Sequence, residues 1–291
     1  MNSIKNKLLL VAQYLLPHHF ISKIFWCFAN CRILWFKNFL IRYFIKKYNI
    51  DLKEYKFQNY YEYISFNDFF TRPLSNVHYR LNEQQYKENI LISPADGLIN
   101  EYGYISNGTL IQAKSHIYSV YNLLGNNLED SNKFNKGSFI NIYLSPRNYH
   151  RVHMPLDGLL EKIIHIPGKL FSVNPFIAKK IPNLYARNER VVCLFETISG
   201  SMAVILVGSM IVSSIETVWT GMINSNVPIS NIHTFNINTI KHPLFLKKGE
   251  ELGKFRIGST VIVLFSNNKI DWDNVLDSRK DVFFGQKIAM F

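Results

Sequence analysis

The stretch Gly249-Glu-Glu-Leu-Gly-Lys-Phe-Arg-Ile-Gly-Ser-Thr-Val-Ile-Val-Leu-Phe265 decides how the rest of the chain is interpreted. Its glycine-rich first half leads into Gly258-Ser259, and a β-branched run typical of a strand follows. Glycine lets the backbone bend sharply there and brings the Ser259 hydroxyl against the preceding carbonyl. Gly-Ser pairs also occur elsewhere in the chain, where they most often form only turns.

Short apolar runs separated by turn signals extend from residue 93 towards the C-terminus. The clearest runs are Phe139–Leu144, Val191–Phe195, Met202–Val207 and Val261–Phe265. Runs of this length, bounded by Gly, Pro and Asp, predict strands. We therefore expect residues 51–291 to form one α+β domain, with a predominantly antiparallel β body.

Three short segments interrupt this β pattern. Ser65 is placed to cap a helix that must end before Pro73. Ser115 is placed to cap another helix, which stops at Gly125. The segment Pro175–Asn188 is predicted to be helical or irregular.

Residues 1–50 differ from the rest in charge and aromatic content. They hold eight Lys and Arg residues, no Asp or Glu, and eleven aromatic residues, so most of the net charge of +12 lies there. Prolines, histidines and cations interrupt every apolar run, and no cleavage site is visible, which argues against a membrane span or a signal peptide. We predict an N-terminal layer of amphipathic helices lying on an anionic bilayer; the alternative is an ordinary helical layer packed on the body.

The same charge distribution argues against a nucleic-acid-binding groove, so we expect no nucleic-acid partner. Three cysteines, Cys27, Cys31 and Cys193, fit small buried side chains in a reducing compartment better than a disulfide framework. Their spacing does not suggest a metal site, and we predict none.

Three separate motifs carry a resemblance to a known family. They are Ser93-Pro-Ala-Asp96-Gly97, Tyr149-His150-Arg151-Val-His153-Met-Pro155 and Gly258-Ser259-Thr260. In this order the motifs resemble the signature set of bacterial phosphatidylserine decarboxylases. Further blocks match along the chain: Phe69–Pro73, Gly168–Pro175, Asn183–Arg190 and Ile215–Trp219.

Asp96, His153 and Ser259 form an Asp–His–Ser set. An acid can orient a histidine, which can then take a proton from a serine hydroxyl. Taken singly, Asp96 also fits a turn residue and His153 a satisfied core histidine. The resemblance implies that the three act together.

The resemblance implies that this set cuts its own chain at Gly258-Ser259. The activated Ser259 hydroxyl attacks the Gly258 carbonyl, so the amide becomes an ester. Elimination then releases a β chain, residues 1–258, and leaves an α chain, residues 259–291. Residue 259 becomes dehydroalanine, which takes up water and loses ammonia to leave a covalent pyruvoyl group.

The family uses this pyruvoyl group as its cofactor. Its ketone forms a Schiff base with the serine headgroup of phosphatidylserine and accepts electrons as carbon dioxide leaves, which yields phosphatidylethanolamine. His150 is our candidate proton donor. In a regular strand His150 and His153 face opposite ways, so both serve one site only if the backbone departs from that geometry. Arg151 either binds the headgroup or forms a structural ion pair.

These implications define the expected setting and its rivals. We expect an enzyme of phospholipid biosynthesis on the cytoplasmic face of the bacterial inner membrane, with a homodimer possible. The first alternative is a membrane-associated serine hydrolase using Asp96, His153 and Ser259, although Ser259 lies in no Gly-x-Ser-x-Gly elbow. Others are a non-enzymatic lipid-surface module, and a paralogue that acts on another lipid or a soluble amine.

Overall fold

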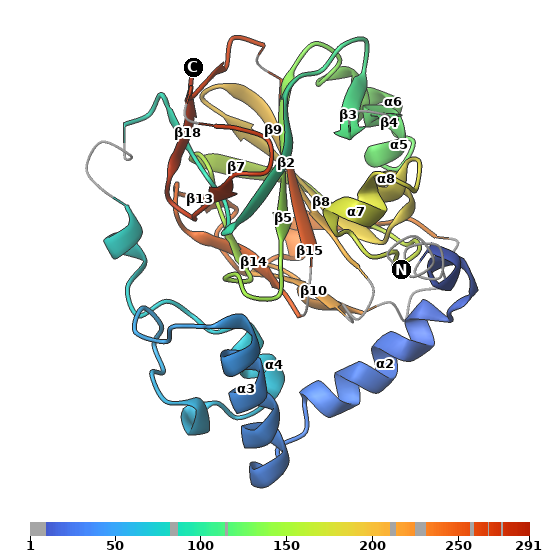
Figure 1. The fold of residues 1–291 in the computed structure, drawn as a ribbon. Coiled ribbons are helices and arrows are strands. Elements are labelled where there is room, and N and C mark those ends of the chain that lie inside the picture. Colours follow the sequence, from blue (N-terminus) through green and yellow to red (C-terminus); the bar gives the residue numbers. More distant parts are fainter. Residues whose placement is uncertain are drawn as a thin grey trace.

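A computed structural model describes residues 10–81, 87–113, 116–209, 214–224, 231–256, 259–266, 268–274 and 276–291. Antiparallel sheets form the body of the molecule, and short helices lie around it (Figure 1). The prediction of an α+β fold with a predominantly antiparallel β body is confirmed. The predicted N-terminal helices are also present.

A nine-stranded sheet contains most of the body, and every pairing between its strands is antiparallel. Its strands, in spatial order, are β12 (His233–Phe235), β7 (Gly158–Ile166), β8 (Arg190–Thr197), β9 (Gly200–Val207), β15 (Ser259–Phe265), β5 (Ser138–Leu144), β2 (Gly97–Tyr104) and β17 (Asp281–Val282). The short strand β13 (Phe245–Leu246) pairs with β7. The four strands predicted from apolar runs are therefore β5, β8, β9 and β15.

Three smaller sheets complete the body. The four-stranded sheet has the order β11 (Gly221–Asn224), β10 (Ser214–Thr217), β14 (Glu251–Phe255), β6 (Arg151–His153). The three-stranded sheet has the order β1 (Ile90–Ile92), β18 (Lys287–Met290), β16 (Asp271–Trp272). The last pair is β3 (Thr109–Ala113) with β4 (His116–Ser119).

Strand β15 is central because both of its faces are buried. Val261, Val263 and Phe265 belong to one apolar core, which also contains residues of the four-stranded sheet. Ile262 and Leu264 belong to a second core on the other face of the sheet. Burial on both sides explains why this strand is a continuous apolar run rather than an alternating one.

The second core is covered by short helices. They are α5 (Val120–Leu123), α7 (Pro175–Ala178) and α8 (Leu184–Arg187), with α6 (Leu128–Asn132) beside α5. The predicted stop at Gly125 is confirmed, since this glycine follows α5 with a positive φ of 78°. The predicted cap Ser115 lies outside the described residues; the helix begins later, and Ser119 caps it by accepting from the Asn122 amide.

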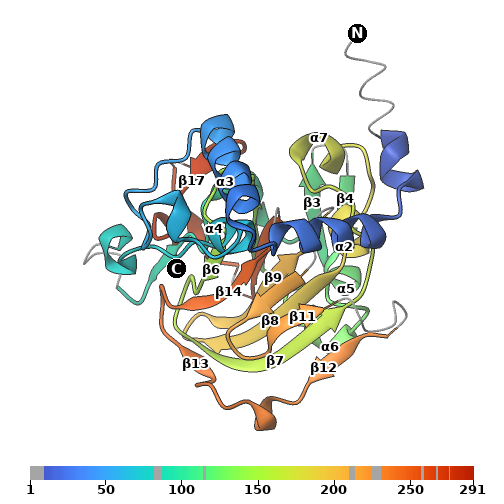
Figure 2. The same cartoon turned by 90° about the horizontal axis from the view of Figure 1, so that it is seen from below.

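The N-terminal layer lies below the body in Figure 1 and runs across one end of the sheets in Figure 2. Ser65 caps α4 as predicted, accepting a hydrogen bond from the Asp68 amide. The layer consists of α2 (His18–Ala29), α3 (Leu34–Tyr48), η1 (Tyr60–Glu62), α4 (Phe66–Phe70) and η2 (Val77–Arg80), and a further short helix, η4 (Ile237–Thr239), lies in the body.

The helix α3 packs inward through a lysine. Lys37 is buried, and its ammonium donates to the carbonyl oxygens of Tyr63 at 2.6 Å and Tyr61 at 3.1 Å. Burial lowers the pKa of this lysine. Lys37 therefore fixes α3 to η1, unlike its exposed neighbours Lys46 and Lys47.

Candidate active site

Two connecting segments bring two of the three sequence motifs together. The segment 145–150 connects β5 to β6, and the segment 256–258 connects β14 to β15. Hydrogen bonds hold the two segments beside each other. At one end Ser259 pairs with Leu144, and at the other the Phe255 amide donates to the His150 carbonyl at 3.0 Å. The start of β15 and the Tyr149–His153 motif therefore share one corner of the fold.

Ser259 is the first residue of β15 and is completely buried. Alternation along the strand places its side chain on the same face as Val261 and Val263, towards the four-stranded sheet. Its hydroxyl has no hydrogen-bond partner among the residues that the structure describes. A buried hydroxyl without a partner is costly, and such groups often belong to functional sites. Gly258, the other residue of the predicted cleavage site, lies outside the described residues.

His150 precedes β6 and is also completely buried. Its Nδ1 atom lies 2.8 Å from the Asn148 carbonyl, so this nitrogen carries the hydrogen and Nε2 is left with a lone pair. Nε2 has no partner. Burial, together with the nearby Arg72 guanidinium, lowers the pKa of His150 to about 3, so the ring is neutral near pH 7.

His153 has partners on both ring nitrogens. Nδ1 lies 2.8 Å from the Gly249 carbonyl and donates to it, while Nε2 accepts from the Tyr149 hydroxyl at 2.9 Å. Burial lowers the pKa of His153 to about 3. The ring also stacks on Phe284, with the ring centres 3.9 Å apart.

Asp96 contacts the backbone of the same phenylalanine, Phe284. Its carboxylate accepts from the Phe284 amide at 2.8 Å and from Arg80 at 2.5 Å. Burial raises the pKa of Asp96, and Arg80 opposes that shift. The structure therefore brings Asp96 and His153 to one cluster, where Phe284 contacts both, but no hydrogen bond joins them. Nor does one join Ser259 to either histidine.

The strand geometry separates the two histidines, as the motif spacing suggests. Val152 and Met154 point into the first core, and His150 shares their parity, whereas Arg151 and His153 lie on the other face. A bulge where β6 pairs with β14 interrupts the regular register next to His153. Arg151 forms an ion pair with Glu251 at 2.6 Å, which supports the structural alternative for this residue.

Two pockets lie near the side chains of His153 and His150. One, of about 830 Å³, is lined by His153 together with the segment Phe245–Glu251. The other, of about 450 Å³, is apolar and lies in the helical layer, where Phe70 and Pro146 form part of its wall. The Phe70 ring centre is 4.0 Å from that of His150, so a wall residue of the apolar pocket packs on this histidine.

Sequence patterns did not single out the groups that connect the predicted residues. Arg80, 16 residues before Asp96, and Phe284, 188 residues after it, both contact its carboxylate, and no motif marks either of them. Tyr149 stood within a motif as a neighbour of His150, which was the only available signal. Among the residues that the structure describes, no three His, Cys, Asp or Glu side chains are grouped as metal ligands.

Comparison with known proteins identifies the family. The family model described as phosphatidylserine decarboxylase matches residues 66–290, and a second model described as PSD matches residues 8–49. The chain belongs to the phosphatidylserine decarboxylase family, as the motifs indicate. It is 44% identical over 286 residues to the phosphatidylserine decarboxylase proenzyme of Pseudomonas fluorescens (strain Pf0-1), covering 98% of each chain.

Two further relatives carry the same name. The proenzyme of Pseudomonas aeruginosa (strain LESB58) is 44% identical over 289 residues, which cover 99% of this chain and 98% of the relative. The proenzyme of Ectopseudomonas mendocina (strain ymp) is 45% identical over 285 residues, covering 98% of each chain. The similarity therefore includes both the helical layer and the β body.

Proposed function

We propose that the chain cuts itself at Gly258-Ser259 and that Ser259 becomes the pyruvoyl group with which the enzyme decarboxylates phosphatidylserine. Family membership makes the chain a phosphatidylserine decarboxylase, produced as a proenzyme and processed into two chains. The single observation that carries the assignment of Ser259 is its hydroxyl, which is buried and unpartnered at the start of a central strand.

The surroundings of residue 259 fit a pyruvoyl group. The position is sealed from water, and His150, a neutral histidine with a free Nε2, is nearby in the fold. When present, the group supplies a ketone that binds the substrate amine and accepts electrons from the breaking bond. The chain's own contribution is to exclude water and to hold a proton acceptor or donor beside the reacting carbon.

His153 is the proposed base for self-cleavage, and Asp96 supports it. The Gly249 carbonyl fixes the tautomer of His153, so Nε2 is the nitrogen that can accept a proton. In this conformation Nε2 accepts a hydrogen bond from the Tyr149 hydroxyl, and this hydrogen bond must break before Nε2 can take a proton from Ser259. Asp96 acts through Phe284, which it holds at the backbone while the ring stacks on His153.

His150 is the proposed proton donor in decarboxylation. It has the same parity along the chain as Val152 and Met154, which face the first core as Ser259 does, and its ring packs on Phe70. Its Nε2 atom is free to exchange a proton there. The two histidines would thus have different roles: His153 is needed for self-cleavage, and His150 for decarboxylation.

The proposed products are residues 1–258 and residues 259–291. The smaller product contains β15, which is hydrogen-bonded to β9 on one side and to β5 on the other. All seven residues of this strand are buried. Cutting the bond before Ser259 therefore leaves the α chain held in the centre of the body.

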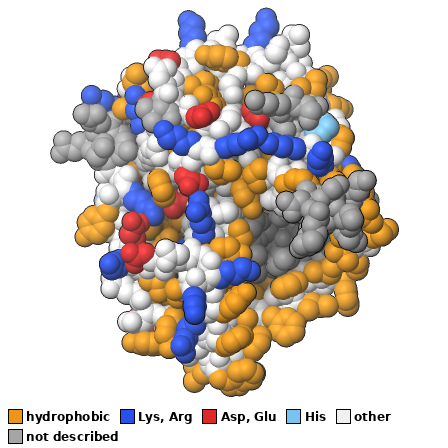
Figure 3. Space-filling view, in the orientation of Figure 1, with side chains coloured by type: hydrophobic (Ala, Val, Ile, Leu, Met, Phe, Trp, Pro, Cys, Tyr) orange, Lys and Arg blue, Asp and Glu red, His pale blue; other side chains and the backbone are white. Residues whose placement is uncertain are grey.

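The helical layer is proposed to attach the enzyme to its lipid. The helix α2 turns Ser22 and Ala29 inward and exposes Phe20 and Phe28, the reverse of a helix that packs on a soluble core. Figure 3 shows apolar side chains gathered along the lower edge of the molecule, where α2 and α3 lie in Figure 1. This surface would lie on the cytoplasmic face of the inner membrane, with residues 1–50 as the attachment region and 51–291 as the catalytic domain.

The described residues contain no single helix long and apolar enough to cross a bilayer. Together, α2 and α3 have the length and composition of a membrane span, but the chain bends by 110° between them.

A serine hydrolase using Asp96, His153 and Ser259 is the rival proposal. It requires the Ser259 hydroxyl to meet a foreign ester, but this side chain is completely buried, which favours attack on the chain itself. An intact-mass spectrum of the denatured protein tests the proposal. We expect two chains separated after Gly258, the smaller beginning with a pyruvoyl group. A single uncut chain that a serine-directed phosphonate labels would support the hydrolase.

A further inference from the structure

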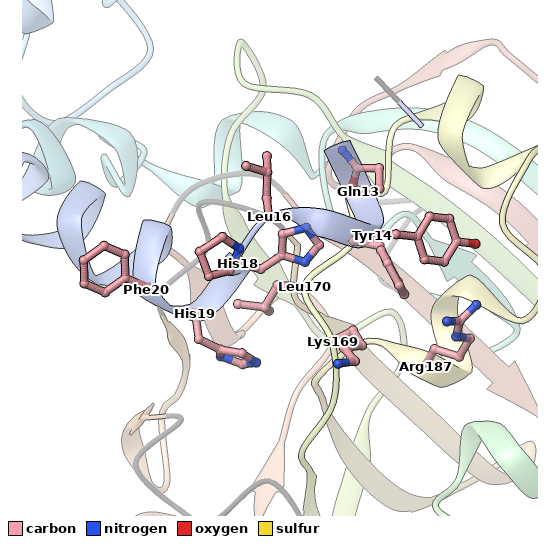
Figure 4. A pocket seen from close by; sticks show the side chains of 11 residues that line it. Gln13, Tyr14, Leu16, His18, His19, Phe20, Lys169, Leu170 and Arg187 are labelled. Atoms are coloured by element: carbon pink, nitrogen blue, oxygen red, sulfur yellow. The ribbon is translucent and has the colours of Figure 1, made fainter. Parts of the chain in front are cut away.

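A pocket of about 450 Å³ lies where the start of α2 meets the body, away from the residues assigned above. Its lining comes from the segment Gln13–Phe20 on one side and from Lys169–Phe171 and Arg187 on the other (Figure 4). No aspartate or glutamate is among the lining residues. The pocket is therefore cationic and lacks a built-in counter-charge.

The first element of the pocket is the uncapped N-terminus of α2. Pro17 occupies the cap position, no side chain accepts from the first turn, and no acidic residue lies in that turn. The first amide bonded back along the helix is that of Ile21, which donates to Pro17 at 3.0 Å. The amides of His18, His19 and Phe20, in the first turn of α2, are therefore free to bind an anion. The helix dipole also favours an anion at this end of the helix.

The second element is His18, whose side chain is only 6% exposed and lines the pocket. No described residue forms a hydrogen bond with its Nε2 atom. Figure 4 shows the ring in the middle of the lining group, above Leu170. A buried polar atom without a partner, turned into a cationic pocket, indicates a missing hydrogen-bond partner, and the surrounding positive charge favours an anion in that role.

The third element is a pair of exposed cations from the body. No carboxylate pairs with Lys169 or Arg187 among the described residues; the Arg187 guanidinium lies over the Phe171 ring at 4.8 Å. The two walls are tied together, since His19 Nε2 donates to the Gly168 carbonyl at 3.1 Å and the Ser172 amide donates to Gln13 at 2.8 Å. The cations and the helix start are thus held in one place.

We propose that this pocket binds the phosphate group of a membrane phospholipid, held by the free amides of α2, His18, Lys169 and Arg187. Free inorganic phosphate has the same chemistry, but the rim favours a lipid: Leu15 is 77% exposed and Phe20 63% exposed, placed to contact acyl chains. The bound phosphate would fix α2 at a defined depth and angle on the bilayer. Only the choice of lipid over free phosphate rests on the proposed membrane attachment.

The charge of His18 provides a direct reporter. Burial lowers the pKa of His18, and the positive charges of His19 and Lys169 lower it further. Arg187 also faces the pocket, and no carboxylate lines it. A bound phosphate would favour the protonated ring, so the pKa of His18 should rise when the pocket is filled.

The test is an NMR titration of full-length processed protein with labelled histidines, in which the His18 signal is assigned by its loss in His18→Gln. Separate arms contain inorganic phosphate or monomeric dihexanoylphosphatidylglycerol. We expect the lipid to raise the pKa of His18 at lower concentration than phosphate does. The Lys169→Gln/Arg187→Gln variant should bind the lipid roughly tenfold or more weakly, because charge-assisted hydrogen bonds are lost.

The matched control is Lys23→Gln/Arg32→Gln, which removes two exposed cations of the helical layer outside the pocket. An equal loss of affinity in the control, or no response of His18 to either ligand, would overturn the proposal. A response to inorganic phosphate alone would overturn the lipid as its source. Chain cleavage and vesicle binding are measured in parallel, so a failure of the pocket is distinct from a failure of the proposed function.

Discussion

The corner around Ser259 and the helical layer place their polar and apolar groups in opposite ways. In the corner, the polar side chains of Ser259, His150 and His153 are buried. In the layer, Trp35 and Phe39 face solvent on α3, while Lys37 is turned inward. An ordinary soluble protein buries its apolar side chains and exposes its polar ones, so it would show neither pattern. The first pattern suits chemistry sealed from water, and the second suits attachment to lipid.

The sharpest test of the corner compares two adjacent hydroxyls. Ser259 and Thr260 are both buried and both unpartnered, but alternation places them on opposite faces of β15. We expect Ser259→Ala to abolish both chain cleavage and decarboxylation, because no ester and no ketone can form. Thr260→Val should be cleaved and active. The measurements are intact mass and release of carbon dioxide from phosphatidylserine vesicles.

A cleaved Ser259→Ala protein would place the cut elsewhere. Loss of cleavage in Thr260→Val, with an unchanged circular dichroism spectrum, would contradict the assignment of faces.

The next comparison separates the two histidines within the corner. We expect His153→Gln and Asp96→Asn to remain uncut, since the base or its support is lost. His150→Gln should be cut but should decarboxylate at least ~10²-fold more slowly, the usual contribution of a general acid. Cleavage is followed on denaturing gels, and turnover is measured per pyruvoyl group. Normal maturation of His153→Gln, or an uncut His150→Gln, would reverse the proposed roles.

The sequence predicted the strands of this corner but not its connections. Apolar runs are strong local signals, so β5, β8, β9 and β15 were found close to their observed bounds. The motifs identified Asp96, His150, His153 and Ser259 as candidates. The contacts of Arg80 and Phe284 with Asp96 depend on tertiary packing across up to 188 residues, and no local pattern encodes them. For the same reason, Lys37 could be counted as a cation but not recognised as buried.

The helical layer is tested by removing its exposed apolar side chains. Leu34, Trp35 and Phe39 point outward from α3, while Lys37 and Ile41 hold its inner face. Replacing the three outward residues with Gln should weaken binding to anionic vesicles by roughly 10²-fold, at ~1 kcal/mol per side chain partly withdrawn from the interface. Chain cleavage should be unchanged. Vesicle co-sedimentation across lipid concentrations gives the affinities.

The matched control for the layer replaces Ile117, Leu128 and Ile198 with Gln. These side chains are similarly exposed but lie on the body. An equal loss of vesicle binding in both triple variants would mean that the layer holds no special membrane surface.

The smallest expected effect is a pH dependence of stability that distinguishes buried from exposed histidines. His150 and His153 each have a pKa of about 3 in the folded chain, against 6.5 for an ordinary histidine. Between these values the unfolded chain binds more protons, so the free energy of unfolding falls as the pH decreases below 6.5. At pH 5 each histidine should account for about 2 kcal/mol of lost stability relative to pH 7.

Urea unfolding at pH 7 and pH 5, in a Ser259→Ala background that stays one chain, measures this difference. His150→Gln should reduce the loss between the two pH values by about 2 kcal/mol, because glutamine does not titrate. His233→Gln, at an exposed position, should leave the loss unchanged. If His150→Gln behaved like His233→Gln, the inner histidine would be protonated or open to water in the folded chain. It could not then serve as the sealed proton donor that distinguishes this corner from the helical layer.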